Sequence, residues 1–135
     1  MLIPLITSTP RISTAEFDNL EKGIGGQLPP DFKDIYLSIN GGNIDDSKDS
    51  NSLLLPGFLP IRYGKVPMEQ AYRELIEDFP TIKEKPPFAF DEGGNYFLLS
   101  SFGHDQGEVG LWIIDTEEHH SVAESFSELL IRLSA

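Results

Sequence analysis

The spacing of apolar residues changes along the chain, and this change constrains the fold more than any other feature. In residues 14–24 and 30–39 apolar side chains recur every three or four positions, as in amphipathic helices. Between residues 88 and 114, short apolar runs are separated by turn-forming residues, which predicts strands joined as hairpins. Helical spacing returns near the C-terminus. Helices before and after a run of strands predict an α+β fold, with a mixed or mainly antiparallel sheet flanked by N-terminal helices and a C-terminal helix.

Residues typical of helix ends delimit the first two helices. Ser13 and Glu16 have the spacing of a capping box, so the first helix is predicted to begin there and to end at the glycines of 23–26. The prolines at 29–30 are suited to the first turn of a second helix. We expect 40–42, Asn-Gly-Gly, to end this helix in a left-handed conformation.

The middle of the chain is less regular. Residues 43–52 are polar and turn-forming, which predicts a mobile surface loop. Residues 53–63 are apolar but contain two prolines, which confines them to edge or bulged strands. A third helical pattern begins at Pro67 and should end near 79–80.

The last helix is expected to follow a second capping-box pattern. Ser121 and Glu124 have the same spacing as Ser13 and Glu16. An apolar stripe runs through Val122, Phe126, Leu129, Leu130 and Leu133. These residues predict a helix that starts at about Ser121.

Length and composition exclude several classes of protein. At 135 residues, the chain is predicted to form one domain, residues 1–135. It has no cysteine, which excludes disulfides and thiolate zinc sites and agrees with a cytoplasmic location. No apolar run is long enough to span a membrane, and the first residues lack the pattern of a signal peptide. The formal charge of −12 argues against nucleic acids and anionic membranes as partners, and favours a basic protein.

Four segments resemble a known family, in the family's order. The first is LPPDFKDIYLSINGG at 28–42, and the others are 87–97, 107–112 and 122–126. Together they resemble the SUKH superfamily, which includes fungal cell-wall-synthesis regulators and many bacterial immunity proteins. The resemblance implies an α+β domain that binds another protein, in bacteria often a toxin with nuclease or deaminase activity. The matching residues are those of the fold, so the resemblance implies no catalytic position.

Two loops superficially resemble ligand sites. The glycines of 23–26 lack the Lys-Ser/Thr of a phosphate loop and follow a helix instead of a strand. Residues 45–51 space oxygen ligands like a calcium loop, but Lys48 intrudes and Ser50 replaces the required glycine. We predict no cofactor at either loop.

The histidines and serines also suggest no catalytic or metal site. His119 and His120 are adjacent, so on an extended chain they point to opposite faces and make a poor chelating pair. The segment from Ser100 through His104 to Asp105 holds the letters of a catalytic triad, but lacks a nucleophile elbow. We predict that the protein is not an enzyme and binds no metal.

The distribution of charge is the most informative functional feature. Between Lys85 and Arg132 the sequence has no lysine or arginine but nine acids: Asp91, Glu92, Asp105, Glu108, Asp115, Glu117, Glu118, Glu124 and Glu128. These acids either keep the protein soluble or form a docking surface for a basic protein. Trp112, the only tryptophan, is either a core residue of the sheet or an exposed interface anchor.

These patterns lead to one functional prediction and one alternative. The prediction is an immunity protein that occludes a toxin domain, with Asp91, Glu92, Asp105, Glu108, Trp112, Asp115, Glu117 and Glu118 as the partner-binding residues. The alternative is an intracellular regulatory scaffold that binds host proteins without neutralising a toxin. A gene for a secreted toxin next to this one would favour the first. The oligomeric state is left open.

Overall fold

The computed structural model describes residues 5–6, 9–44 and 55–134. Its helices are α1 (Thr14–Ile24), α2 (Pro30–Ser38), α3 (Met68–Asp78), the short 3-10 helix η2 (Pro80–Ile82) and α4 (Phe126–Ser134). Its strands are β1 (Leu5–Ile6), β2 (Gly42–Ile44), β3 (Gly57–Phe58), β4 (Pro87–Phe90), β5 (Tyr96–Leu99), β6 (Val109–Ile113) and β7 (Glu118–Ala123). No described helix has the length and apolar character needed to cross a bilayer.

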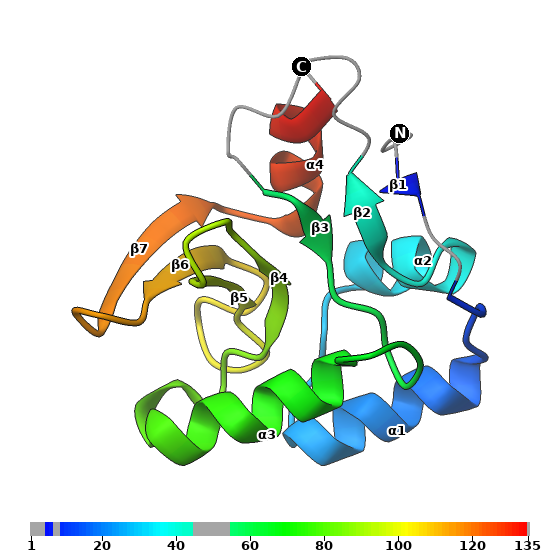
Figure 1. The fold of residues 1–135 in the computed structure, drawn as a ribbon. Coiled ribbons are helices and arrows are strands. Elements are labelled where there is room, and N and C mark those ends of the chain that lie inside the picture. Colours follow the sequence, from blue (N-terminus) through cyan, green and yellow to red (C-terminus); the bar gives the residue numbers. More distant parts are fainter. Residues whose placement is uncertain (1–4, 7–8, 45–54, 135) are drawn as a thin grey trace.

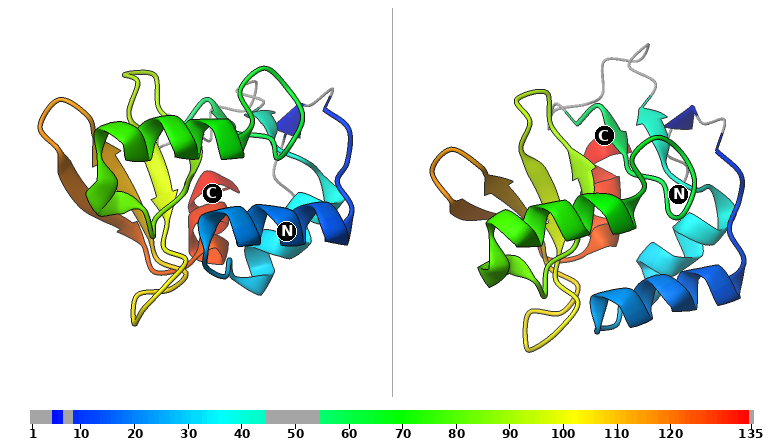
Figure 2. Two further views of the ribbon diagram at one scale, coloured as in Figure 1. Left: turned by 90° about the horizontal axis from the view of Figure 1, so that it is seen from below. Right: turned by 60° about the horizontal axis from the view of Figure 1, so that its bottom comes forward.

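The seven strands form one sheet in the order of the sequence, and every neighbouring pair is antiparallel. This arrangement confirms the predicted α+β class and the antiparallel sheet. Strands β4 to β7 form a meander, with β7 at the outer edge (Figure 1). In Figures 1 and 2, α3 and α4 lie on opposite sides of this meander.

Alternation along the strands explains why the two faces bind different helices. Leu98 and Trp112 point to one face, where they pack with Leu75 of α3 and Ile82. Phe97 and its neighbours on the other face join the main core, to which α1, α2 and α4 contribute together with Met68 and Ala71 at the start of α3. The sheet therefore has apolar residues on both faces of its central strands.

Aromatic rings form the centre of the main core. Phe32 of α2 stacks on Tyr36 with ring centroids 4.4 Å apart, and it forms T-shaped pairs with Phe88 and Phe126. All four side chains are fully buried. The helical spacing read from residues 30–39 thus places Phe32 and Tyr36 at the core as predicted, and the sheet and α4 close around them.

The C-terminal helix begins later than predicted, because the prediction used the wrong one of two similar motifs. Residues 118–123 pair with β6 as strand β7, so Ser121 lies in a strand. The helix begins at Phe126, and its cap is Ser125, whose Oγ accepts a hydrogen bond from the Glu128 N–H at 3.1 Å.

Two expectations for the middle of the chain were also wrong. Residues 43–44 belong to strand β2, so the predicted loop does not begin at 43; its remaining residues, 45–52, lie outside the described residues. The strand in 53–63 is β3, which lies inside the sheet between β2 and β4 and not at an edge. Because β3 has only two residues, Pro56 and Pro60 both fall outside it and do not disturb its pairing.

Candidate protein-binding surface

Two hairpin turns meet at one end of the sheet. Because the strands alternate in direction, the β4–β5 turn (91–95) and the β6–β7 turn (114–117) lie at the same end, and the 100–108 connection lies at the opposite end. The two turns are joined directly, because the Ile114 N–H donates to Asn95 Oδ1 at 3.0 Å. This bond fixes the acidic residues of both turns relative to each other.

The first turn is shaped by Asp91. Its Oδ1 accepts hydrogen bonds from the N–H groups of Gly93 and Asn95, both at 2.9 Å, and its Oδ2 accepts one from Asn95 Nδ2 at 3.1 Å. Asp91 therefore stabilises the turn from within. Glu92, the next residue, is exposed.

The second turn adds three more carboxylates. Asp115, Glu117 and Glu118 are all exposed, and Glu117 has a left-handed backbone with φ of 56°. We call Asp91, Glu92, Asp115, Glu117 and Glu118 the hairpin-end acids. Across the part of the chain that the structure describes, none of them forms a salt bridge with a lysine or arginine. His120 Nε2 lies 4.0 Å from Glu118 Oε2 and forms an ion pair with it only when protonated, so no lysine or arginine of the described residues neutralises the charge of these acids.

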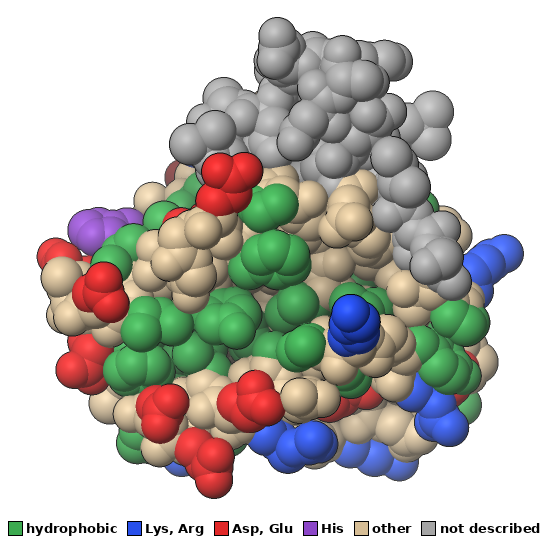
Figure 3. All heavy atoms as spheres, in the orientation of Figure 1, with side chains coloured by type: hydrophobic (Ala, Val, Ile, Leu, Met, Phe, Trp, Pro, Cys, Tyr) green, Lys and Arg blue, Asp and Glu red, His purple; other side chains and the backbone are tan. Residues whose placement is uncertain are grey.

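Half-buried apolar side chains lie beside these acids. Tyr96 follows the first turn, Ile114 begins the second, and Phe79 lies at the end of α3 with its ring 5.4 Å from that of Trp112. Figure 3 shows hydrophobic side chains gathered between the sheet and α3, with acidic side chains along the left-hand and lower borders. An apolar centre with a charged rim is the usual composition of a protein-binding surface.

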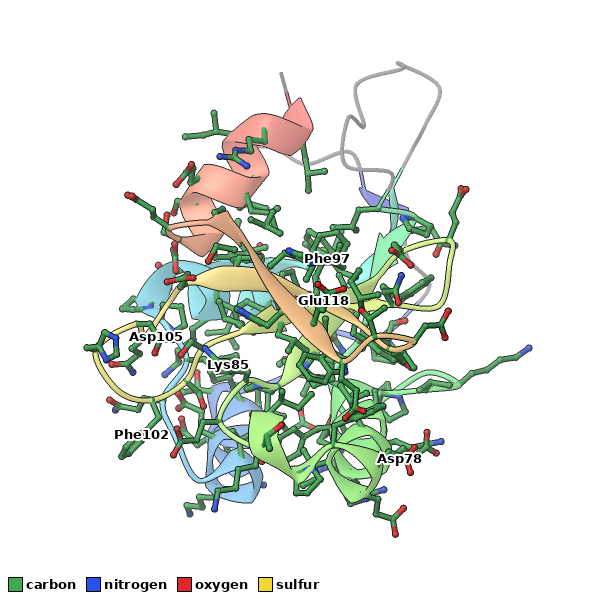
Figure 4. The ribbon with its side chains drawn as sticks, turned by 90° about the vertical axis from the view of Figure 1, so that its left-hand side faces the viewer. Asp78, Lys85, Phe97, Phe102, Asp105 and Glu118 are labelled. Atoms are coloured by element: carbon green, nitrogen blue, oxygen red, sulfur yellow. The ribbon has the colours of Figure 1, made fainter. Side chains whose placement is uncertain are left out.

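Asp105 and Glu108 lie away from the hairpin-end acids, in the connection at the other end of the sheet. Asp105 Oδ2 accepts a hydrogen bond from Lys85 Nζ at 2.6 Å, and Oδ1 accepts one from Ser100 Oγ at 3.0 Å. The bond from Lys85 holds the pKa of Asp105 below its usual value. Glu108 accepts a hydrogen bond from Ser121 at 2.7 Å. Figure 4 shows Lys85 and Asp105 well separated from Asp78 and Glu118.

Trp112 belongs to the core. Its side chain is only 6% exposed and packs with Leu75, Ile82 and Leu98 between α3 and the sheet. Of its two predicted roles, the structure therefore favours the sheet-core role over the exposed anchor. Its indole N–H is buried and has no hydrogen-bond acceptor among the described residues.

The glycine loop at 23–26 and the segment from Ser100 to Asp105, which the sequence analysis did not interpret as ligand or catalytic sites, have structural roles. Gly25, with φ of 79°, ends α1. Asp105 pairs with Lys85 and Ser100, while His104 is exposed.

The ring of His119 lies directly over Gly110, and burial lowers the pKa of this histidine. The calcium-like segment 45–51 lies outside the described residues. Within the described ranges, no three His, Asp or Glu side chains converge as metal ligands would.

Sequence reasoning missed two surface features. One is the apolar patch of Phe79, Tyr96 and Ile114, because strand pairing and the packing of α3 on the sheet, and no local pattern, bring these residues together. The other is an open groove of about 700 Å³ between the end of α1 and the 100–107 loop, bordered by Phe102. Phe102 is 56% exposed, and an aromatic residue among serines and glycines was the one available signal.

Comparison with known proteins identifies a family over most of the chain. The sequence pattern of the SMI1 / KNR4 family (SUKH-1) matches residues 11–132. A search of curated proteins finds no match. The matched range runs from the residues before α1 into α4, so it includes the turns and strands of the candidate surface.

Proposed function

Because this chain belongs to the SMI1 / KNR4 family (SUKH-1), we propose that it acts in the cytoplasm by binding another protein, as an immunity protein that neutralises a bacterial toxin domain. The partner is a basic protein, because the net charge of −12 attracts cationic surfaces and repels anionic ones. Nucleases are suitable candidates, since a groove that holds phosphates must be positively charged. Deaminases that act on nucleic acid share this requirement.

One observation carries the proposal: five carboxylates gather at one end of the sheet without a lysine or arginine partner among the described residues, around half-buried apolar side chains. Complementary charge speeds the encounter of two proteins, and the apolar centre supplies contact area once they meet. An interface of standard size, about 800 Å² on each partner, would need this patch and its rim together. Binding at a toxin's basic groove would occlude its substrate.

The proposal is tested with the toxin domain encoded beside this gene. The two proteins are mixed, and both complex formation and the toxin's activity on its substrate are measured. A complex in which the activity is lost supports the proposal. Binding to a host protein with no effect on any toxin would instead support a regulatory scaffold, and failure to bind any neighbouring toxin domain would count against the immunity function.

A further inference from the structure

Strand β7 leaves one long edge of the sheet open. It pairs with β6 on one side, and no described residue pairs with its other side. Its first four residues, Glu118 to Ser121, are all exposed. Figures 1 and 4 show its outer side uncovered by any helix or loop of the described chain. The opposite edge strand, β1, has only two residues.

The backbone of this edge can bind another strand. In a strand paired on one side, alternate residues direct their N–H and C=O groups outward. At the C-terminal end of β7 these groups are occupied, because Arg132 donates to the Val122 carbonyl and the Glu124 N–H donates to Glu128. Along 118–121, the outward groups have no partner in the described ranges. The available edge is therefore four residues long.

This edge lacks the usual protection against pairing. Edge strands are commonly blocked by lysine, proline or a bulge. Residues 118–121, Glu-His-His-Ser, contain neither lysine nor proline, and the register shift of the β6–β7 pair lies after Ser121. In the described chain the edge is thus open in shape, and the acid that it carries, Glu118, makes its charge negative.

Charge decides which strand the edge would accept. Glu117 and Glu118 stand at its start, Glu124 at its end, and Glu108 beside Ser121. A second copy of this chain would bring these acids against the same acids of its neighbour, and both molecules carry −12. A strand with lysine or arginine side chains would instead place opposite charges side by side.

We propose that an extended basic segment of the partner protein adds to the sheet as a strand beside β7. The inference rests on the proposed function and specifies how the partner is held: backbone hydrogen bonds along 118–121 supplement the contacts of the hairpin-end acids. The two surfaces are continuous, because Glu118 belongs to both. Alternate residues of the added strand would lie beside Glu118 and His120 on one face and beside His119 and Ser121 on the other.

A peptide tests the edge without the partner. The probe is acetyl-Lys-Val-Lys-Val-Lys-Val-Lys-amide, and its control is the same peptide with every backbone amide methylated, which keeps the charge but removes the donors. We expect the probe to slow hydrogen exchange about tenfold or more at alternate amides of 118–121, and the control to leave exchange unchanged. Equal effects of both peptides, or changes confined to the turns 91–95 and 114–117, would overturn the inference.

A variant tests the edge with the toxin domain. His119 and His120 are neighbours in β7, so the N–H of one points outward and the N–H of the other points toward β6. Proline at the outward position leaves the β6–β7 hydrogen bonds intact, so this variant is identified as the one of His119→Pro and His120→Pro whose melting temperature is unchanged. We expect that variant to weaken toxin binding at least tenfold. If it binds and inhibits like the wild type, the inference fails while the proposed function stands. If the wild type does not bind the toxin, the proposed function fails, and the peptide experiment alone then tests whether the β7 edge accepts a strand. The peptide experiment is also the test if neither proline variant folds.

Discussion

Asn40 shows how a single side chain can have a role that its local sequence does not reveal. It is fully buried, and its Nδ2 donates to the carbonyls of Pro10 and Ile61 at 3.0 and 2.9 Å, while its Oδ1 accepts from the Ile61 N–H at 2.7 Å. The sequence predicted a left-handed helix stop at 40–42. In the structure α2 ends at Ser38 and its C-cap residue, Ile39, is extended; within 40–42 the positive φ angles are those of Gly41, 71°, and Gly42, 129°, while Asn40 has a different role.

Asn40→Ala should therefore destabilise the protein by about 2–3 kcal/mol, because it leaves buried backbone groups of two other segments without partners. The measurement is urea unfolding followed by circular dichroism. Asn19→Ala, at an exposed position of α1, is the matched control and should change stability by less than about 0.5 kcal/mol. Equal effects of the two substitutions would show that the Asn40 hydrogen bonds do not hold these segments together.

The two predicted roles of Trp112 can be distinguished by measuring only the stability of its variants. Because its indole N–H has no acceptor among the described residues, Trp112→Phe breaks no hydrogen bond and should cost about 1 kcal/mol. Trp112→Ala removes most of a buried side chain and should cost about 3–5 kcal/mol. Both are measured by thermal unfolding. An interface anchor would give the opposite result: unchanged stability of the free protein with both substitutions.

At the scale of the element, the two Ser-x-x-Glu motifs near the C-terminus compete for the start of α4. Pairing with β6 keeps 118–123 extended, so the second motif caps the helix. Ser125→Ala should therefore cost about 1 kcal/mol, and Ser121→Ala less than about 0.5 kcal/mol. Melting temperatures of the two variants compare the motifs directly. A larger loss at Ser121 would place the helix start where the sequence predicted it.

The hydrogen bonds at the start of α1 make the stability of the fold depend on pH. The carboxylate of Glu16 accepts hydrogen bonds from the Ser13 N–H at 2.9 Å and the Tyr63 hydroxyl at 2.7 Å, and lies 2.9 Å from Arg62 Nε. The Ser13 and Tyr63 bonds are the main causes that lower the pKa of Glu16. Since the pKa is lower in the folded state, this stabilisation is complete above the unfolded value, about 4.3, and is lost as the pH falls through the folded value.

The corresponding experiment compares the wild type with Glu16→Gln across a range of pH. The wild type should melt at the higher temperature near neutral pH, and the difference should shrink as the pH falls below about 4. Differential scanning calorimetry of both proteins in matched buffers measures this. A difference that stays constant with pH would mean that the ionised carboxylate does not stabilise the helix start.

The elements that were predicted correctly are those whose signals are local. Periodic apolar spacing and capping residues suffice for α1, α2 and α3, and hairpin turns suffice for β4, β5 and β6. The short strands β1 and β2 are held by pairing with distant segments and have no local pattern that marks them. The apolar run of 53–63 did indicate a strand, β3, but could not show that it lies inside the sheet. The same limit applies to the surface: the acids were identified in the sequence, but the separation of Asp105 and Glu108 from the others follows from strand direction and register.

At the scale of the whole molecule, the account depends on where the negative charge lies. A net charge of −12 attracts any basic protein weakly, whatever its distribution. The hairpin-end acids add a local attraction to this general one, because they concentrate negative charge at one end of the sheet around Phe79, Tyr96 and Ile114. Reversing charge there should therefore affect binding more than the same reversal elsewhere. A matched triple at exposed acids outside the hairpin ends and the β7 edge, Asp18, Asp34 and Glu84, changes the net charge equally.

The most direct test measures the association rate with the toxin domain by stopped flow, at about 50 mM and about 500 mM salt. We expect Glu92→Lys, Asp115→Lys and Glu117→Lys together to slow association at least about tenfold at the lower salt, and the control triple, Asp18→Lys, Asp34→Lys and Glu84→Lys, to slow it less than about threefold. Equal rates for the two triple variants, or a wild-type rate that does not change with salt, would contradict the claim that these acids form the docking surface.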